Sequence, residues 1–123
     1  MSRANSLIAG VFLAAAALPA AAQNLHVNDA AYVGIARCQG LINSDALQPQ
    51  VDPAGINRFM NLQSAGRTPN VVDQATSSRT VATRAAQAAG PDEKALLIAE
   101  RDGPCRRWSV MGARAPTGAL TGN

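Results

Sequence analysis

The chain has 123 residues, enough for one small domain, and its 11 basic and 8 acidic side chains give a net charge of +3 at pH 7. Aromatic residues make up 3% of the sequence, and the arginines are scattered along it. A nucleic-acid-binding surface gathers its basic residues on one face and interleaves them with aromatic side chains, so this composition argues against nucleic acid as a partner.

The first 22 residues have the three parts of an export signal. A positive charge precedes an apolar run over residues 7–18, and Ala20 and Ala22 stand at the −3 and −1 positions of a cleavage site. A helix that crosses a bilayer needs about 20 apolar residues, so a run of about a dozen predicts a removable signal and no permanent membrane anchor. We therefore expect a periplasmic or secreted protein that begins at Gln23 after signal-peptide cleavage at Ala22.

Four amphipathic helices are expected after the signal, and no segment shows the period-2 alternation of a strand. Each helix begins at a capping residue, at a proline or at both, and each ends near a glycine or a proline. The predicted ranges are 29–47, 53–65, 69–89 and 91–102. The expected fold class is all-α, a small bundle of about four short helices with one disulfide, in which short connections favour antiparallel neighbours.

The predicted core is thin, because aliphatic residues are few and alanine supplies much of the apolar surface of the third helix. Gly34 and Gly40 either weaken the first helix or allow a neighbouring helix to approach closely. In the fourth helix, Leu96, Leu97 and Ala99 are expected to form the apolar side. The inner face of the second helix is expected to consist of Ile56, Phe59, Met60 and Gln63.

Cys38 and Cys105 are the two cysteines of the chain. In an exported protein a lone pair of this kind predicts one disulfide bond. Cys38 lies on the apolar face of the first helix and Cys105 follows the fourth, so the bond would tie the two ends of the domain together. A loop of this length is credited with roughly 4 kcal/mol in the chain-entropy model, a large share of the stability of a small domain.

The residues needed for familiar enzymatic sites are scarce. His26 is the single histidine and lies in the lead-in to the first helix, so a catalytic triad or a multi-histidine zinc site lacks its parts. The sequence has no glycine-rich phosphate loop, nucleophile elbow, C-x-x-C pair or calcium loop. We expect no catalytic residue, no metal site and no cofactor, and hence a protein that is not an enzyme.

Arg106, Arg107 and Trp108 form a cluster with the character of a recognition site, since arginine and tryptophan are enriched at interface hot spots. In the alternative interpretation, Trp108 packs against the first helix beside the disulfide and the arginines face solvent. Residues 23–110 are expected to form the helical domain. Residues 111–123 are short of apolar side chains and rich in Gly, Thr and Pro, which predicts a disordered C-terminal tail.

These observations favour an exported, non-enzymatic helical protein that binds another protein or an envelope component. The expected architecture is also similar to that of small periplasmic stress chaperones, although no motif of that group maps onto this chain position by position. A holdase-like periplasmic stress protein, which would expose its alanine and valine faces when destabilised, is therefore the alternative function.

Overall fold

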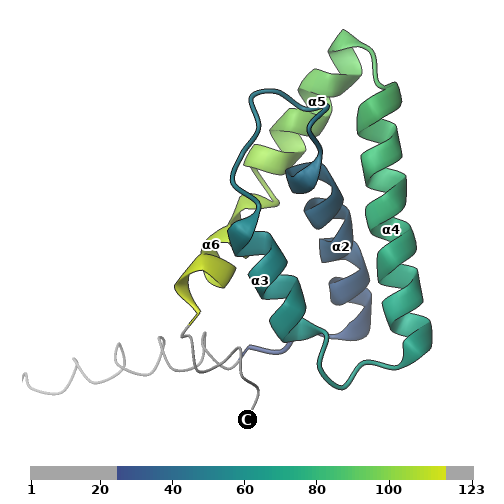
Figure 1. Cartoon of the computed structure of the whole chain (residues 1–123), viewed down its shortest axis with the longest axis vertical. Helices are drawn as coiled ribbons and strands as arrows, with labels where there is room; N and C mark the ends of the chain where they lie inside the picture. The colour runs from purple at the N-terminus through teal and green to yellow at the C-terminus, as the bar shows by residue number, and fades with distance from the viewer. Residues whose placement is uncertain (1–24, 116–123) are drawn as a thin grey trace, which may run out of the picture.

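The computed structural model describes residues 25–115, which form five helices and contain no strand (Figure 1). The helices are α2 Asp29–Asn43, α3 Ala54–Gln63, α4 Pro69–Ala88, α5 Pro91–Asp102 and α6 Arg106–Arg114. The expected all-α class is confirmed, and α2 to α5 lie where the sequence pattern places four helices. The expected signal peptide, with its cleavage site at Ala22, lies outside the described residues.

Side chains that precede the helices explain where several of them begin. Asn28 and Thr68 each accept a hydrogen bond from the backbone N–H of the third helical residue, at 2.8 Å and 3.4 Å. Asp52 accepts one from the N–H of Ala54, the first residue of α3, at 3.0 Å. These bonds satisfy N–H groups that have no partner within the helix itself.

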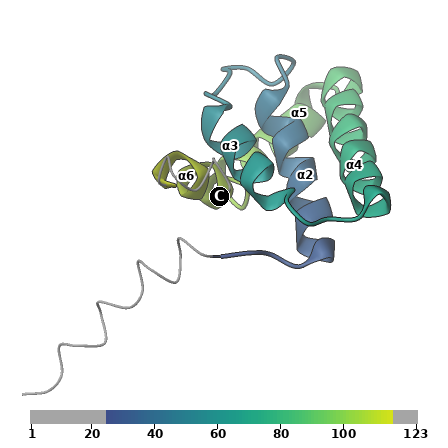
Figure 2. The ribbon, with the colours of Figure 1, turned by 60° about the horizontal axis from the view of Figure 1, so that its bottom comes forward.

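The helices form two pairs. α2 packs along α4 and α3 packs against α6, while α2 also contacts α3 and α5. Figures 1 and 2 show α3 between α6 and α2, with α4 on the far side of α2 (Figure 2). The last helix, α6, is therefore held to the rest of the domain mainly through α3.

The α2–α4 pair is close because glycine and alanine line its contact. At Gly40 of α2, a Cβ atom would overlap the carbonyl oxygen of Arg79 in α4 and lie 2.9 Å from the Cβ of Ala82. At Gly34, by contrast, a Cβ atom would meet nothing within 4 Å. Of the two expected roles, close approach therefore applies to Gly40, whereas Gly34 lies beside open space.

Two expectations about helix ends and faces need correction. The first helix, α2, ends at Asn43 and not at residue 47, because the chain turns away there and inserts Leu47 into the core. In α5, Leu97 is buried as expected, but Ala99 is exposed, Leu96 is 72% exposed and Arg101 is 2% exposed. The guanidinium of Arg101 donates from Nη1 to the carbonyl oxygen of Leu47 at 2.9 Å, and this contact accounts for the burial of a charged side chain.

The sequence pattern does not predict α6, which includes residues 111–114 of the expected tail. Residues 116–123 lie outside the described part of the chain. α6 packs backbone to backbone on α3, since a Cβ at Gly112 would overlap the carbonyl oxygen of Gly55. Gly112, although glycine disfavours helix formation, is thus a contact residue between α6 and α3.

Candidate functional site

The disulfide between Cys38 and Cys105 anchors the start of α6. The two Cα atoms are 5.3 Å apart, within the range that a disulfide requires, and Cys105 is fully buried. Cys38 lies in the middle of α2, and Cys105 immediately precedes α6. The expected pairing is confirmed, and it joins the first described helix to the first turn of the last.

That first turn carries the cluster Arg106, Arg107 and Trp108, here called the α6 patch. Both arginines are exposed and Trp108 is half-buried. The guanidinium carbon of Arg107 lies 4.4 Å from the ring centroid of Trp108, a cation–π geometry. On its buried side Trp108 contacts Phe59 of α3, with ring centroids 5.2 Å apart, so its aromatic neighbour comes from α3 and not from α2.

Charge is unevenly distributed between the two helix pairs. The α3–α6 pair contains no aspartate or glutamate, and it carries the arginines Arg58, Arg106, Arg107 and Arg114. Within residues 25–115, the ion pairs are Arg37–Glu100, Arg67–Asp29 and Arg101–Asp102. None of them involves an arginine of α3 or α6, although Asp102 lies close enough to Arg106 for the charge of Arg106 to contribute to the lowered pKa of Asp102.

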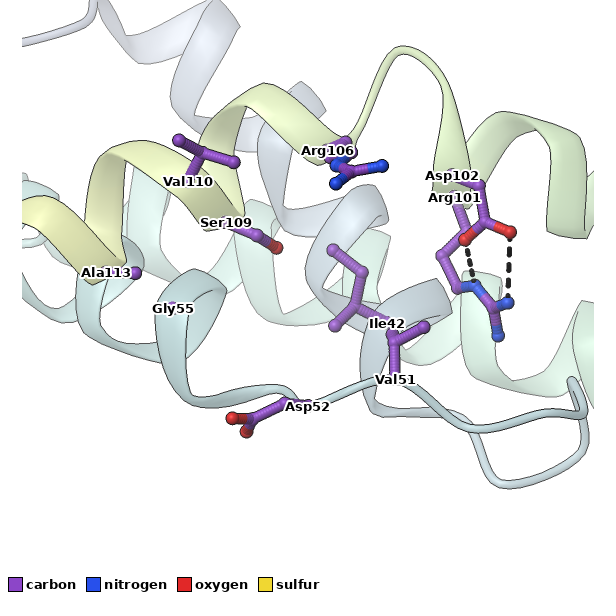
Figure 3. Close-up of a pocket in the computed structure, with 10 residues that line it drawn as sticks. All are labelled: Ile42, Val51, Asp52, Gly55, Arg101, Asp102, Arg106, Ser109, Val110 and Ala113. Carbon is purple, nitrogen blue, oxygen red and sulfur yellow. Dashed lines mark hydrogen bonds and ion pairs between the residues drawn. The ribbon is translucent and has the colours of Figure 1, made fainter.

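A groove of about 570 Å³ runs along one flank of α6, between this helix and the loop before α3. We call it the loop groove. Figure 3 shows Arg106 on the α6 side and Asp52 on the opposite side, with Ile42 and Val51 between them. Its size falls within the range of about 300–1,000 Å³ that is usual for ligand sites.

Arg101 and Asp102 close one end of the loop groove (Figure 3). Arg101 donates from Nε and Nη2 to the two carboxylate oxygens of Asp102, at 2.8 and 3.3 Å. Hydrogen bonds from Arg101 lower the pKa of Asp102 below its ordinary value, even though this carboxylate is half exposed. Together with the bond to Leu47, these contacts hold the 44–53 loop against α5, so we assign this pair a structural role.

A second, smaller groove of about 170 Å³ lies between the ends of α3 and α6 and the segment that leads into α2. We call it the α3–α6 groove. The residues that line it are Leu25, Phe59, Leu62, Gln63, Val110, Met111, Arg114 and Ala115. Val110 lines both grooves, so α6 is flanked by a depression on each side.

A further network of hydrogen bonds joins the side chains of Gln39, Asn43, Asn57 and Arg79, which line another depression. Residues 25–115 hold no group of three or more His, Cys, Asp or Glu side chains arranged to bind a metal ion. His26 is exposed beside the start of α2. In the same part of the chain, none of the helices has the length and apolar character needed to cross a membrane.

No protein-family model, curated protein or solved structure matches this chain. A functional assignment therefore depends on the geometry and charge of α6 and its surroundings.

Proposed function

We propose that this chain is an exported, non-enzymatic binding protein that recognises a protein partner through the α6 patch. The observation that carries the proposal is the segregation of charge, with arginines and no carboxylate in the α3–α6 pair. Arg106 and Arg107 are exposed at one end of this pair. A partner surface that presents carboxylates would be attracted to them and would form charge-assisted hydrogen bonds.

The local structure of α6 supports a role beyond folding. Basic residues in the first turn of a helix oppose the helix dipole, and the first turn of α6 has two of them and no acidic residue. The N-cap residue, Cys105, contributes no side-chain hydrogen bond. Features that are locally unfavourable are concentrated at functional sites in proteins, where binding compensates for them.

The stacking of Arg107 on Trp108 also favours recognition. Contact with the indole restricts the long arginine side chain before a partner arrives, so less conformational entropy is lost when it binds. The contact between Trp108 and Phe59 fixes the indole in turn. Arginine and tryptophan in such a rigid arrangement are typical of interface hot spots.

Export rests on the N-terminal sequence and is compatible with the disulfide, which persists in oxidising compartments. Protein recovered from the envelope fraction should begin at Gln23, as read by intact mass spectrometry. Recovery of a chain that still carries Met1 would contradict cleavage at Ala22.

The binding role can be tested by capture of partners from an envelope extract on immobilised protein. Arg107→Glu should abolish capture of the specific partner. Arg84→Glu is the matched control, because Arg84 is also an exposed helical arginine and its replacement changes the charge equally, but it lies on α4. Loss of capture with both variants, or with neither, would overturn the proposal.

An aggregation assay with the same variant, Arg107→Glu, separates this proposal from a holdase-like role. Within the described range, 25–115, the exposed large hydrophobic side chains are Leu25, Val72, Val81 and Leu96, and they are divided among the N-terminal segment, α4 and α5. They do not form the continuous apolar surface that a holdase needs to retain unfolded clients. Suppression of client aggregation by wild-type protein and by Arg107→Glu alike would favour the holdase and contradict binding through α6.

A further inference from the structure

The α3–α6 groove has an apolar interior and lies at the opposite end of α6 from the α6 patch. Phe59, Leu62 and Met111 contribute apolar side chains to its lining, and Leu25 lies at the N-terminal side. Its volume of about 170 Å³ is close to the roughly 150 Å³ of an engineered cavity that holds benzene. The groove therefore has room for one large apolar side chain, and it is too small for a typical cofactor.

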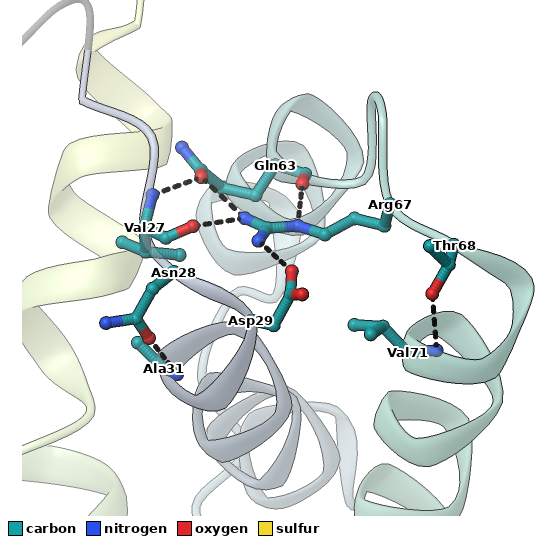
Figure 4. Close-up of polar contacts among 8 residues, drawn as sticks. All are labelled: Val27, Asn28, Asp29, Ala31, Gln63, Arg67, Thr68 and Val71. Atoms are coloured by element: carbon teal, nitrogen blue, oxygen red, sulfur yellow. Dashed lines mark hydrogen bonds and ion pairs between the residues drawn. The ribbon is translucent and has the colours of Figure 1, made fainter.

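The N-terminal wall of this groove is held in place by hydrogen bonds. Gln63 donates from Nε2 to the carbonyl oxygen of Leu25 at 2.8 Å, and its Oε1 accepts from the N–H of Val27 at 2.9 Å. Arg67 donates to the carbonyl oxygen of Val27 at 2.6 Å and to Asp29 at 2.8 Å (Figure 4). The segment that forms this wall is consequently ordered before any ligand binds, which lowers the entropy that binding would cost.

Positive charge surrounds the other end of the groove. Arg114 lines it directly, and Arg58 donates from Nη2 to the carbonyl oxygen of Ala115 at 2.7 Å. The buried Nε of Arg58 has no hydrogen-bond partner among the described residues. Among residues 25–115, no carboxylate lines the groove beside Arg114.

We propose that the α3–α6 groove binds an acidic segment of a partner protein. One large apolar side chain of this segment would lie in the groove, and its carboxylates would lie against Arg114 and Arg58. The inference rests on the proposed function and names the chemistry of the partner. Charge complementarity selects acidic residues, and the volume of the groove selects a single anchor.

An anionic lipid surface fits the structure less well than an acidic peptide. A helix that binds at a membrane interface inserts its apolar face among the acyl chains. The corresponding side chains of α6, Trp108 and Met111, are half-buried and pack against the hydrophobic core of the domain. The apolar surface that remains is a narrow recess, which suits a side chain better than a bilayer.

The test uses the protein in its disulfide-bonded form, purified from the cells that produce it naturally. The ligand is a peptide of twelve residues labelled with fluorescein. The peptide has one central leucine flanked by glutamates, and its binding is followed by fluorescence anisotropy. We expect saturable binding that weakens as salt is added, because the attraction is partly electrostatic. Replacing the leucine by serine, or the glutamates by lysines, should weaken binding by about tenfold or more.

Variants of the protein locate the binding site. Leu62→Glu places a like charge in the wall of the groove and should weaken binding of the peptide by about tenfold or more. Leu96→Glu is the matched control, since Leu96 is 72% exposed on α5, and it should leave the affinity unchanged. Arg114→Gln should weaken binding and reduce its dependence on salt.

Each result decides between the proposals. Equal binding of the leucine and serine peptides, or unchanged affinity with Leu62→Glu, would overturn the groove as the site. Binding to vesicles that contain anionic lipid, with none to the peptide, would replace the peptide by a lipid surface. If no peptide binds but capture from the extract still depends on Arg107, the groove proposal fails and the proposed function stands. If the peptide binds in the groove but capture does not depend on Arg107, the role of the α6 patch alone is overturned.

Discussion

Gly34 and Gly40 offer a matched pair of substitutions with opposite expected effects, because both lie in the interior of α2. A Cβ at Gly34 would meet nothing within 4 Å, so Gly34→Ala changes the helix without a clash. A Cβ at Gly40 would overlap the backbone of Arg79 in α4, and backbone cannot move aside as a flexible side chain can. The two variants therefore separate the effect of alanine on the stability of helix α2 from its effect on the packing of α2 against α4.

The expected magnitudes follow from these two environments. Alanine in place of a helical glycine contributes about 0.5–1 kcal/mol, and this is the whole effect expected for Gly34→Ala. For Gly40→Ala the same gain is outweighed by overpacking, which costs roughly 1–3 kcal/mol. Because the Cβ would meet backbone atoms of Arg79, we expect the cost of overpacking to lie at about 2–3 kcal/mol, which leaves a net loss of about 1–2 kcal/mol for Gly40→Ala.

Thermal unfolding of the two variants, followed by far-UV circular dichroism, measures the difference. In a domain of this size 1 kcal/mol corresponds to about 4–8 °C, so Tm should rise by a few degrees for Gly34→Ala and fall by about 4–16 °C for Gly40→Ala. A rise in Tm for both variants would refute the reasoning, since it would mean that α2 and α4 can separate slightly at no cost.

Three further predictions concern the disulfide, the docking of α6 and an ion pair. Reduction with dithiothreitol should lower Tm by many degrees, because the bond spans 67 residues and is credited with roughly 4 kcal/mol; an unchanged Tm would show that packing alone stabilises the domain. Gly112→Ala should push α6 off α3 and shift the fluorescence of Trp108, the single tryptophan, to the red, whereas an unshifted spectrum would contradict the close contact with Gly55. Hydrogen bonds from Arg37 hold the pKa of Glu100 below its ordinary value of 4.5, so the stability that this pair contributes is present above that value and is lost as pH falls through the lowered pKa. Glu100→Gln should therefore cost about 0.5 kcal/mol near neutral pH and make urea unfolding less dependent on pH below 4.5, and an unaltered pH profile would contradict the assignment.

The sequence predicts the helices whose ends are determined locally. Asn28 and Thr68 accept the capping hydrogen bonds expected of them, and Pro69 and Pro91 stand at the start of α4 and α5. The inner face of α3 is also predicted residue by residue, because apolar spacing along a short helix leaves one way to bury it. Gln63, a polar member of that face, is buried because it bonds to the N-terminal segment.

Features that depend on distant segments could not be predicted in this way. α6 contains Gly112, which disfavours an isolated helix, and its nine residues are too few to be stable without tertiary packing. The burial of Arg101 in place of Leu96 depends on the carbonyl oxygen of Leu47, which is 54 residues away in the chain. Sequence spacing holds no information about such a partner.

Of the candidate site, the sequence predicts the α6 patch but not the α3–α6 groove. The α6 patch is contiguous in sequence, so its composition alone marks it as a recognition cluster. The α3–α6 groove is assembled from the N-terminal segment, the end of α3 and the end of α6, which meet through folding. The absence of carboxylates from α3 and α6 becomes meaningful once the structure shows that these two helices are a pair.

Site-specific photo-cross-linking in living cells tests the central claim, that the partner binds at α6, most directly. A photoreactive amino acid would replace Ala113 of α6 in one strain and Ala88 of α4 in another, since both residues are exposed on helices and the α6 patch stays intact. Its benefit is that the partner need not be known beforehand, because any protein at the site is trapped. Binding through α6 predicts a discrete cross-linked product from position 113 and none from position 88, whereas a product from position 88 alone would contradict it.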